Sequence, residues 1–266
     1  SYETKFIFFK DHIENLSELL GDMSGSISLT HNFEGFFPRF LVGNIQKSFP
    51  SVSFTHSYYD CSECTGEFDF WNRVSDQYYD SSAYIPLFVS DDFYTDLIIY
   101  PIFSPSNYTI KVDLHDSMGN KVYENNDYLK INGNDGKLQK IQFKDIIINS
   151  KLSTNENYSA HIITTFENKK IPARVKFGLN VGISTSRSKL PCNICFNAQL
   201  SNFNLENKPG SFHWCPIFKN DESVVTIGNF SPIIKYSKVA HIELQFFRKR
   251  DNSSIIRNFT IKPNSE

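Results

Sequence analysis

Side-chain alternation with a period of two residues runs through most of this 266-residue chain, and in its second half the alternating runs look duplicated. The run Tyr158–Phe166 contains Ala-His-Ile and is followed by basic residues. The run Ala240–Phe247 repeats the triplet and the basic ending about 80 residues later. Upstream of each lies another alternating run, at residues 108–114 and 192–198. Because alternation is typical of half-buried strands and a fixed period indicates a repeated unit, the pattern predicts tandem antiparallel β-sandwich units in an all-β protein.

One segment near the N-terminus departs from this alternation. Asp11 with Glu14 three residues later forms a capping-box pattern, and the apolar residues that follow share one helical face up to Gly21. We therefore expect one short helix over residues 11–20. The predicted organisation is this helix plus a β unit over residues 1–93, a middle β-sandwich unit over 94–171 and a C-terminal β-sandwich unit over 172–266.

Composition and charge restrict the class of protein. Hydrophobic residues make up 40% of the chain and aromatic residues 15%, which is too apolar for a disordered protein. The net charge of −2 favours neither nucleic acid nor an anionic membrane as a partner, and no apolar run is long enough to span a bilayer. Acidic residues gather over residues 60–96, and basic ones over 169–189 and 248–250. This asymmetry indicates an acidic face for a basic partner, contact between the two halves, or ordinary solvated strand faces.

The cysteines raise the question of a metal. Two Cys-x-x-Cys pairs and a nearby histidine and cysteine form a candidate structural zinc set, consisting of Cys61, Cys64, Cys192, Cys195, His213 and Cys215. Against this, alternation of residues 192–200 directs Cys192 inward and Cys195 outward, so both sulfurs reach one metal only if the strand breaks. The alternatives are buried thiols and a disulfide at Cys61 and Cys64. No other cofactor is expected.

Two features bear on the cellular compartment. Five cysteines, an odd number, do not form a complete disulfide framework, which favours a reducing, cytoplasmic location. Six Asn-x-Ser/Thr sequons favour the alternative, a secreted or cell-surface glycoprotein that recognises an extracellular ligand. These sequons begin at Asn15, Asn107, Asn157, Asn229, Asn252 and Asn258.

The seven histidines are scattered, and none forms a recognisable catalytic arrangement with a nucleophile. His161 and His241 occupy equivalent positions of the repeat, where we expect both on the outward strand face. The two interpretations are a shared pH-sensitive or ligand site and two tolerated surface residues. The sequence therefore predicts a protein that is not an enzyme.

Adjacent aromatic pairs are the clearest indication of a binding surface. Neighbouring residues of a strand point to opposite faces, so one ring of each pair lies outside the core of its own sheet. The alternatives are burial between the tandem units and an exposed contact surface. The residues that we assign to such an interaction surface are Tyr59, Trp71, Tyr79 and Phe247.

Several segments resemble a meprin-and-TRAF-homology (MATH) domain. Residues 5–17 are similar to the opening strand and Asn-x-Ser turn of that family, residues 108–121 to its central strand and turn, and residues 142–146 with 157–162 to its closing turn and last strand. The resemblance implies an antiparallel sandwich that binds short extended peptides and acts as an adaptor. It assigns no binding residues, because the Gly-Gly-x-x-Trp-like second strand of the family is missing here.

The sequence as a whole predicts a non-catalytic protein-interaction module, an adaptor or scaffold. Its partner would be a peptide or folded protein bound through sheet edges and exposed aromatics. The extracellular glycoprotein is the first alternative, and a zinc-stabilised structural module is the second.

Overall fold

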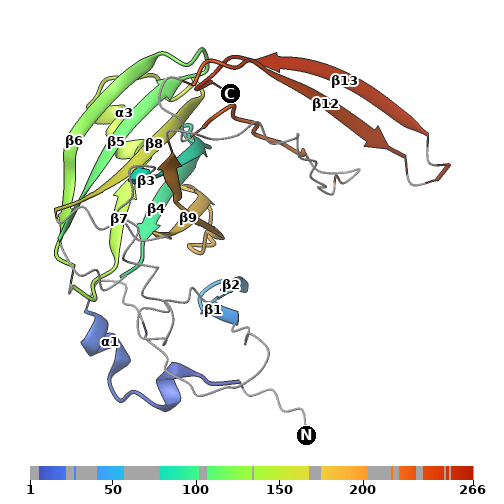
Figure 1. Ribbon diagram of the computed structural model, residues 1–266. Coiled ribbons are helices and arrows are strands. Elements are labelled where there is room, and N and C mark those ends of the chain that lie inside the picture. The colour runs from blue at the N-terminus through green and yellow to red at the C-terminus, as the bar shows by residue number, and fades with distance from the viewer. Residues whose placement is uncertain are drawn as a thin grey trace, which may run out of the picture.

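The computed structural model describes residues 6–21, 27, 41–56, 78–101, 107–133, 135–167, 175–202, 217, 222–231, 236–248, 250–251 and 253–265. Its described part is dominated by strands that pair antiparallel throughout (Figure 1). The predicted all-β class is therefore confirmed. Among these residues, no helix is long and apolar enough to cross a membrane.

A five-stranded sheet forms the larger layer. Its strands lie in the order β11-β3-β8-β5-β6, with β8 at the centre. Their bounds are β3 Tyr78–Leu87, β5 Tyr108–Asp116, β6 Lys121–Ile131, β8 Tyr158–Phe166 and β11 Gln199–Asn202. Alternation predicted strands at residues 108–115 and 158–166, and these are β5 and β8. The two strands pair with each other from Tyr108 opposite Phe166 to Asp116 opposite Tyr158.

A four-stranded sheet forms the second layer, in the order β10-β9-β4-β7. Its strands are β4 Phe93–Ile99, β7 Gln139–Gln142, β9 Lys176–Ile183 and β10 Cys192–Asn197. One apolar cluster draws buried side chains from both sheets, including Ile110 and Ile162 from the larger and Leu97 and Phe177 from the smaller. The two sheets therefore pack as the layers of one sandwich.

The three predicted units share this sandwich. β3 lies within residues 1–93, yet it pairs with β8 of the middle unit and β11 of the C-terminal unit. β4 spans the predicted boundary at residues 93/94 and pairs with β9 of the C-terminal unit. The described strands consequently form one sandwich across the boundaries and not one sandwich for each unit.

Strands at equivalent positions of the predicted repeat occupy different positions in the fold. β8 is the central strand of the larger sheet, whereas β12 (Ala240–Phe247) pairs with β13 (Ser254–Ile261) in a separate two-stranded hairpin. β5 is enclosed on both sides by strands, whereas β10 lies at an edge of the smaller sheet. Similar alternation thus produces different burial because neighbours, and not the pattern alone, determine what a strand face meets.

The helical expectation is partly corrected. A 3-10 turn at Phe9–Asp11 (η1) precedes a short helix α1 at Leu16–Leu20, so residues 11–20 are not one helix. Asn15 between them takes a left-handed backbone with φ of 56°, which interrupts the helical hydrogen bonds. A further helix α3, Phe143–Asn149, buries Phe143, Ile146 and Ile147 in the core.

Two hairpins extend the sandwich. β1 (Leu41–Gln46) and β2 (Ser51–His56) lie near β10, where the Ser53 hydroxyl donates to the Pro191 carbonyl oxygen at 2.7 Å. The β12–β13 hairpin projects away from the two layers (Figure 1). Its base contacts the turn between β5 and β6. The two lie so close that a Cβ atom added at Gly119 would be only 2.8 Å from the Pro263 carbonyl oxygen.

The sandwich core allows a direct test. Ile162 on central β8 is fully buried, whereas Ile183 at the end of β9 is 46% exposed. We expect Ile162→Ala to lower the free energy of unfolding by about 2–4 kcal/mol, because it removes buried methylenes and leaves a cavity. Ile183→Ala should cost well under half as much. Urea denaturation followed by circular dichroism measures both, and equal losses would contradict the assigned core.

Candidate functional site

A row of polar and aromatic side chains crosses the outer face of the larger sheet. Tyr84 of β3 lies opposite His161 of β8, His161 lies opposite Asp113 of β5, and Asp113 lies opposite Glu124 of β6. His115 and Ser159 form the next pair along the two central strands. These residues point away from the sandwich core because they alternate with the core residues of the same strands.

Two polar side chains of this outward face are buried. Asp113 is only 3% and His115 only 7% exposed. His161 lies on the outward strand face, as expected, but its surroundings differ from those of His241. His241 is exposed on the β12–β13 hairpin, while the His161 ring is stacked beneath another aromatic side chain.

Three rings form this stack. The Tyr84 ring lies 3.9 Å from the His161 ring at an interplanar angle of 8°, and 4.6 Å from the Phe230 ring at 4°. Tyr84 is therefore held between a side chain of the sheet and one of the segment that leads to the C-terminal hairpin. Such contacts stabilise the joint between these parts and exclude water from His161.

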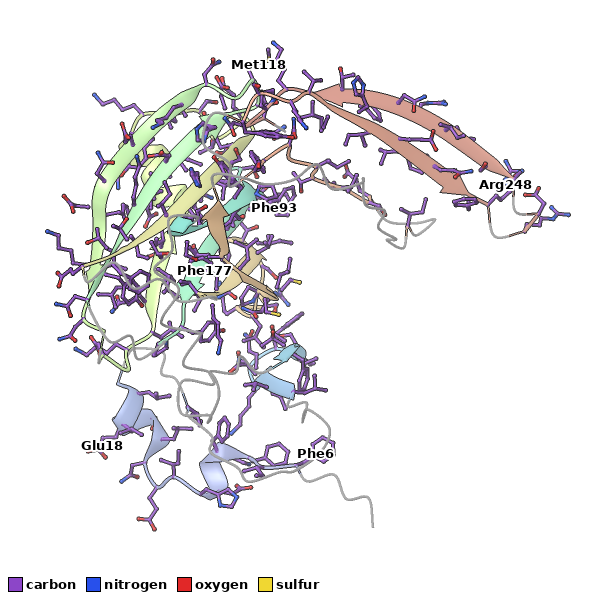
Figure 2. The ribbon with its side chains drawn as sticks, viewed as in Figure 1. Phe6, Glu18, Phe93, Met118, Phe177 and Arg248 are labelled. Carbon is purple, nitrogen blue, oxygen red and sulfur yellow. The ribbon has the colours of Figure 1, made fainter. Side chains whose placement is uncertain are left out.

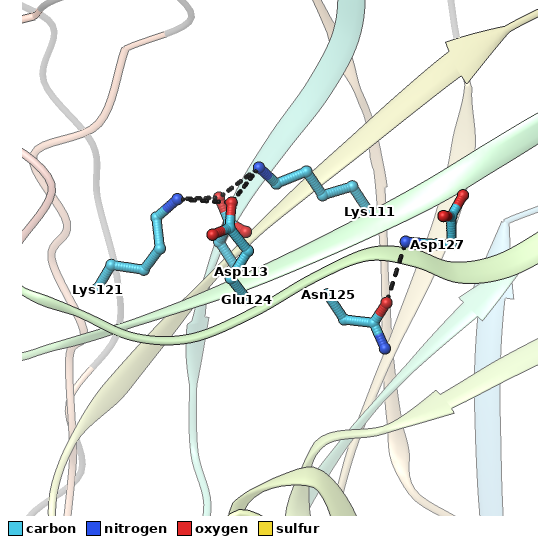
Figure 3. Close-up of polar contacts among 6 residues, drawn as sticks. All are labelled: Lys111, Asp113, Lys121, Glu124, Asn125 and Asp127. Atoms are coloured by element: carbon cyan, nitrogen blue, oxygen red, sulfur yellow. Dashed lines mark hydrogen bonds and ion pairs between the residues drawn. The ribbon is translucent and has the colours of Figure 1, made fainter.

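Two lysines neutralise the carboxylates at the other end of the row (Figure 3). The Lys121 ammonium lies 3.1 Å from the Asp113 Oδ2 atom, and that of Lys111 lies 3.4 Å from the same atom. Both ammonium groups also contact the Glu124 Oε1 atom, Lys111 at 2.7 Å and Lys121 at 3.1 Å. The cluster thus balances two positive and two negative charges, which is what a partly buried ion network requires.

Several buried polar atoms in this region make no hydrogen bond within the described protein. They are Asp113 Oδ1, His115 Nδ1, Ser159 Oγ and His161 Nε2. Burial lowers the pKa of His115, and it lowers the pKa of His161 to about 3, with the charges of His115, Lys111 and Lys121 adding to the effect. Both imidazoles are therefore neutral near pH 7, and the region is a covered polar layer.

One side chain secures the base of the C-terminal hairpin. The Asn229 amide nitrogen donates to the carbonyl oxygens of Lys238 at 2.7 Å and Ile261 at 3.0 Å, and its Oδ1 atom accepts from the Tyr236 hydroxyl at 2.9 Å. Its backbone N–H donates to Ser265 O at 2.9 Å, and its carbonyl accepts from Asn264 N–H at 2.8 Å. Asn229 thereby ties together the segments on both sides of the hairpin.

The hairpin itself has two unlike faces. Cross-strand pairs place on one face Ala240 with Ile261, Ile242 with Phe259, Leu244 with Arg257, and Phe246 with Ile255. The opposite face carries His241 with Thr260, Glu243 with Asn258, Gln245 with Ile256, and Phe247 with Ser254. The first set is apolar except for Arg257, and its most exposed apolar members are Phe246, Ile255 and Phe259. Figure 2 shows the side chains of the projecting hairpin, with Arg248 at its tip.

Of the candidate zinc residues, only Cys192 and Cys195 fall among the described residues; Cys61, Cys64, His213 and Cys215 lie outside them. Both described cysteines are thiols on β10, three positions apart and therefore on opposite faces. The expected orientation is wrong, since Cys192 and Ile194 are exposed while Cys195 is half-buried. No group of three or more potential metal ligands occurs within the described ranges, and the zinc hypothesis stays a prediction.

The predicted aromatic surface is described only in part. Tyr59 and Trp71 lie outside the described residues, and for Tyr79 only the backbone of β3 is described. Phe247 is 47% exposed near the tip of the hairpin. The roles of Tyr84, Phe230 and Asn229 were not predicted, because Asn229 had been considered only as a sequon and no local pattern relates it to the hairpin.

Comparison with protein-family models, curated proteins and solved structures gives no match for this chain. The resemblance to MATH domains therefore stays a prediction, and the functional argument depends on the geometry of the chain itself.

The half-buried His161, whose ring lies against Tyr84, predicts acid sensitivity. Its pKa is about 3 in the folded protein and about 6.5 when exposed, so its contribution to stability is complete above pH 6.5 and is lost as the pH falls toward 3. From pH 7 to pH 5 this one group should lower the free energy of unfolding by about 2 kcal/mol.

Denaturant titrations at several pH values measure this effect. His161→Gln should flatten the pH dependence between pH 7 and pH 5, and His241→Gln, which replaces a histidine on a different element, is the matched control. An unaltered slope in His161→Gln would show that this residue is not the group responsible.

Proposed function

We propose that this chain is a non-catalytic protein-interaction module, an adaptor or scaffold, whose principal binding element is the β12–β13 hairpin. The single observation that supports this most strongly is the hairpin's apolar face. Phe246, Ile255 and Phe259 on that face are 42%, 53% and 50% exposed. Two-stranded hairpins are marginally stable alone in water, so a projecting one with this face gains stability when a partner covers it.

The edges of the hairpin add a second mode of contact. β12 and β13 pair only with each other, so each strand has an edge whose backbone groups are not used by a described neighbouring strand. An extended peptide can pair with such an edge, which is the β-augmentation used by many recognition domains. The backbone would then provide affinity, and Phe246 or Phe247 would provide selectivity.

The polar layer on the outer face of the larger sheet also fits a non-catalytic role. Its carboxylates are paired with lysines, and His161 lies beneath Tyr84 and Phe230. A covered, charge-balanced layer fits a role in holding the hairpin against the sandwich. Under this proposal the partner is a protein or peptide, no nucleic acid or membrane span is involved, and the location is cytoplasmic.

A comparative affinity capture tests the proposal. The double variant Phe246→Ser, Phe247→Ser removes both rings near the hairpin tip and should reduce recovery of the captured partners at least tenfold. Ile148→Ser is the matched control, because Ile148 is 52% exposed on α3 and lies on a different element. Equal recovery by wild type and both variants would contradict binding through the hairpin.

The alternative, an extracellular glycoprotein, is favoured by the exposure of several sequon asparagines. Asn15, Asn107, Asn157 and Asn258 are all exposed. Asn258 lies on the hairpin face opposite the apolar one, where a glycan would leave the apolar face uncovered. Asn229 differs, since it is 6% exposed and both amide hydrogens are engaged.

Glycan occupancy of the native protein tests the extracellular alternative. If the chain is an extracellular glycoprotein, we expect glycans on exposed asparagines such as Asn157 and Asn258 and none on Asn229 in the folded protein. Glycopeptide mass spectrometry of protein from its native source measures this. Native material without any glycan would contradict the extracellular alternative and leave the interaction proposal unaffected.

A further inference from the structure

A second row of polar side chains crosses the outer face of the smaller sheet. Cross-strand pairs place its members at one level on all four strands, and they are Asn193 of β10, Asn180 of β9, Asp96 of β4 and Gln142 of β7. Three of them directly adjoin the core residues Leu179, Leu97 and Ile141 in the chain, so they point away from the core. Each member ends in a planar amide or carboxylate group.

Hydrogen bonds within this row leave donors and acceptors beside one another. The Asn193 amide nitrogen donates to the Asn180 Oδ1 atom at 2.5 Å, so the Asn180 amide nitrogen remains as a donor. Within the described residues, neither that nitrogen nor the Gln142 amide has a hydrogen-bond partner in the protein. Asp96, an acceptor, lies between them. Because a hydroxyl group both donates and accepts, neighbouring donors and acceptors suit a ligand that carries several hydroxyl groups.

The charges of the row favour a neutral ligand. Asp96 is its one ionisable member, and the Lys140 ammonium lies 3.8 Å from the Asp96 Oδ2 atom. An anionic ligand would meet the carboxylate, and a cationic one would compete with Lys140 for it. A neutral ligand leaves this ion pair in place.

An aromatic ring lies beside the row on the same face. Tyr94 is two residues before Asp96 on β4, and it pairs with Gly182 of β9. A Cβ atom added at Gly182 would lie 2.5 Å from the Tyr94 hydroxyl oxygen and 2.6 Å from the Cζ atom, so the ring lies across the glycine. Gly182 has no positive φ, so the close approach of the ring is what excludes a side chain here.

The end of the face that carries Tyr94 is the more open one. Tyr94, Asn180 and Gly182 are half-buried and Gln142 is exposed, whereas Ile98, farther along β4, is buried. Two positions along a strand span about 7 Å. A sugar ring that rests on Tyr94 would therefore bring its hydroxyl groups within hydrogen-bonding reach of Asp96 and Asn180.

We propose that the surface formed by Tyr94, Asp96, Gln142 and Asn180 binds a neutral oligosaccharide. A sugar ring has an apolar C–H face, which packs on an aromatic ring, and hydroxyl groups at its rim, which bond to planar amides and carboxylates. The polar row continues across the strands in both directions from Asp96 and Asn180, so adjoining sugar units would meet Gln142 or Asn193. This site lies apart from the β12–β13 hairpin, and the inference goes beyond the proposed interaction function without depending on it.

Calorimetric titration with four neutral tetrasaccharides tests the site. The probes are cellotetraose, laminaritetraose, maltotetraose and tetra-N-acetylchitotetraose, and at least one should bind with a dissociation constant of about 0.1–1 mM. Tyr94→Ala should weaken that binding at least tenfold. Tyr94→Phe, which keeps the ring, should stay within about threefold of wild type.

Two further variants keep the test independent of a folding defect in Tyr94→Ala. Gly182→Ala retains the tyrosine but displaces its ring, so it should weaken binding as Tyr94→Ala does. Gln142→Ala removes an exposed amide that makes no bond at the start of α3, and it should weaken binding about fivefold. Circular dichroism verifies that each variant is folded. Phe246→Ala, which removes a ring of the hairpin, is the matched control and should bind as wild type does.

Absence of binding by all four tetrasaccharides at about 5 mM would overturn the inference. Wild-type binding by folded Tyr94→Ala, Gly182→Ala and Gln142→Ala would overturn it as well, since the sugar would then bind elsewhere. The hairpin function fails separately. Captured protein partners without sugar binding contradict the sugar site alone, and sugar binding with capture unaffected by the hairpin variants contradicts the hairpin alone.

Discussion

Packing between the inner faces of the two sheets is the interaction on which the rest of the structure depends. Ile110, Val112 and Leu114 of β5 are fully buried beside Ile162 of β8, and they share one cluster with Leu97 and Phe177 of the opposite sheet. Since side chains alternate across a strand, burying this set also determines which residues face outward. The polar layer of Asp113, His115 and His161 follows from the core and from the register of the strands.

The strand positions were largely predictable because alternation depends on nearby residues. Alternation predicted β5, β8, β10 and β12 near their observed bounds. It did not reveal which distant segment covers an outer face. The burial of Asp113 and His115 could not be predicted for this reason, and the contact between Tyr84 and Phe230 is a tertiary one without a local signal.

Other errors have local causes. The expected helix over residues 11–20 is interrupted because Asn15 adopts a left-handed backbone, a conformation that asparagine reaches more easily than most residues. The orientation of Cys192 was wrong because β10 is an edge strand, whose two faces are not both set by the main core. The duplicated pattern indicated strands correctly but did not predict their places, since a central strand and a projecting one can have the same alternation.

Asn229 and Phe230 are consecutive residues, yet one contacts the C-terminal hairpin and the other contacts the sandwich. The Asn229 amide holds the ends of the hairpin, while the Phe230 ring lies on Tyr84 of the sandwich. A one-residue insertion between them would change the spacing between the Asn229 amide and the Phe230 ring, so the amide contacts and the ring contact could not both stay in place. Evolution of this chain should therefore tolerate changes in length elsewhere in the connecting segment far better than at this single peptide bond.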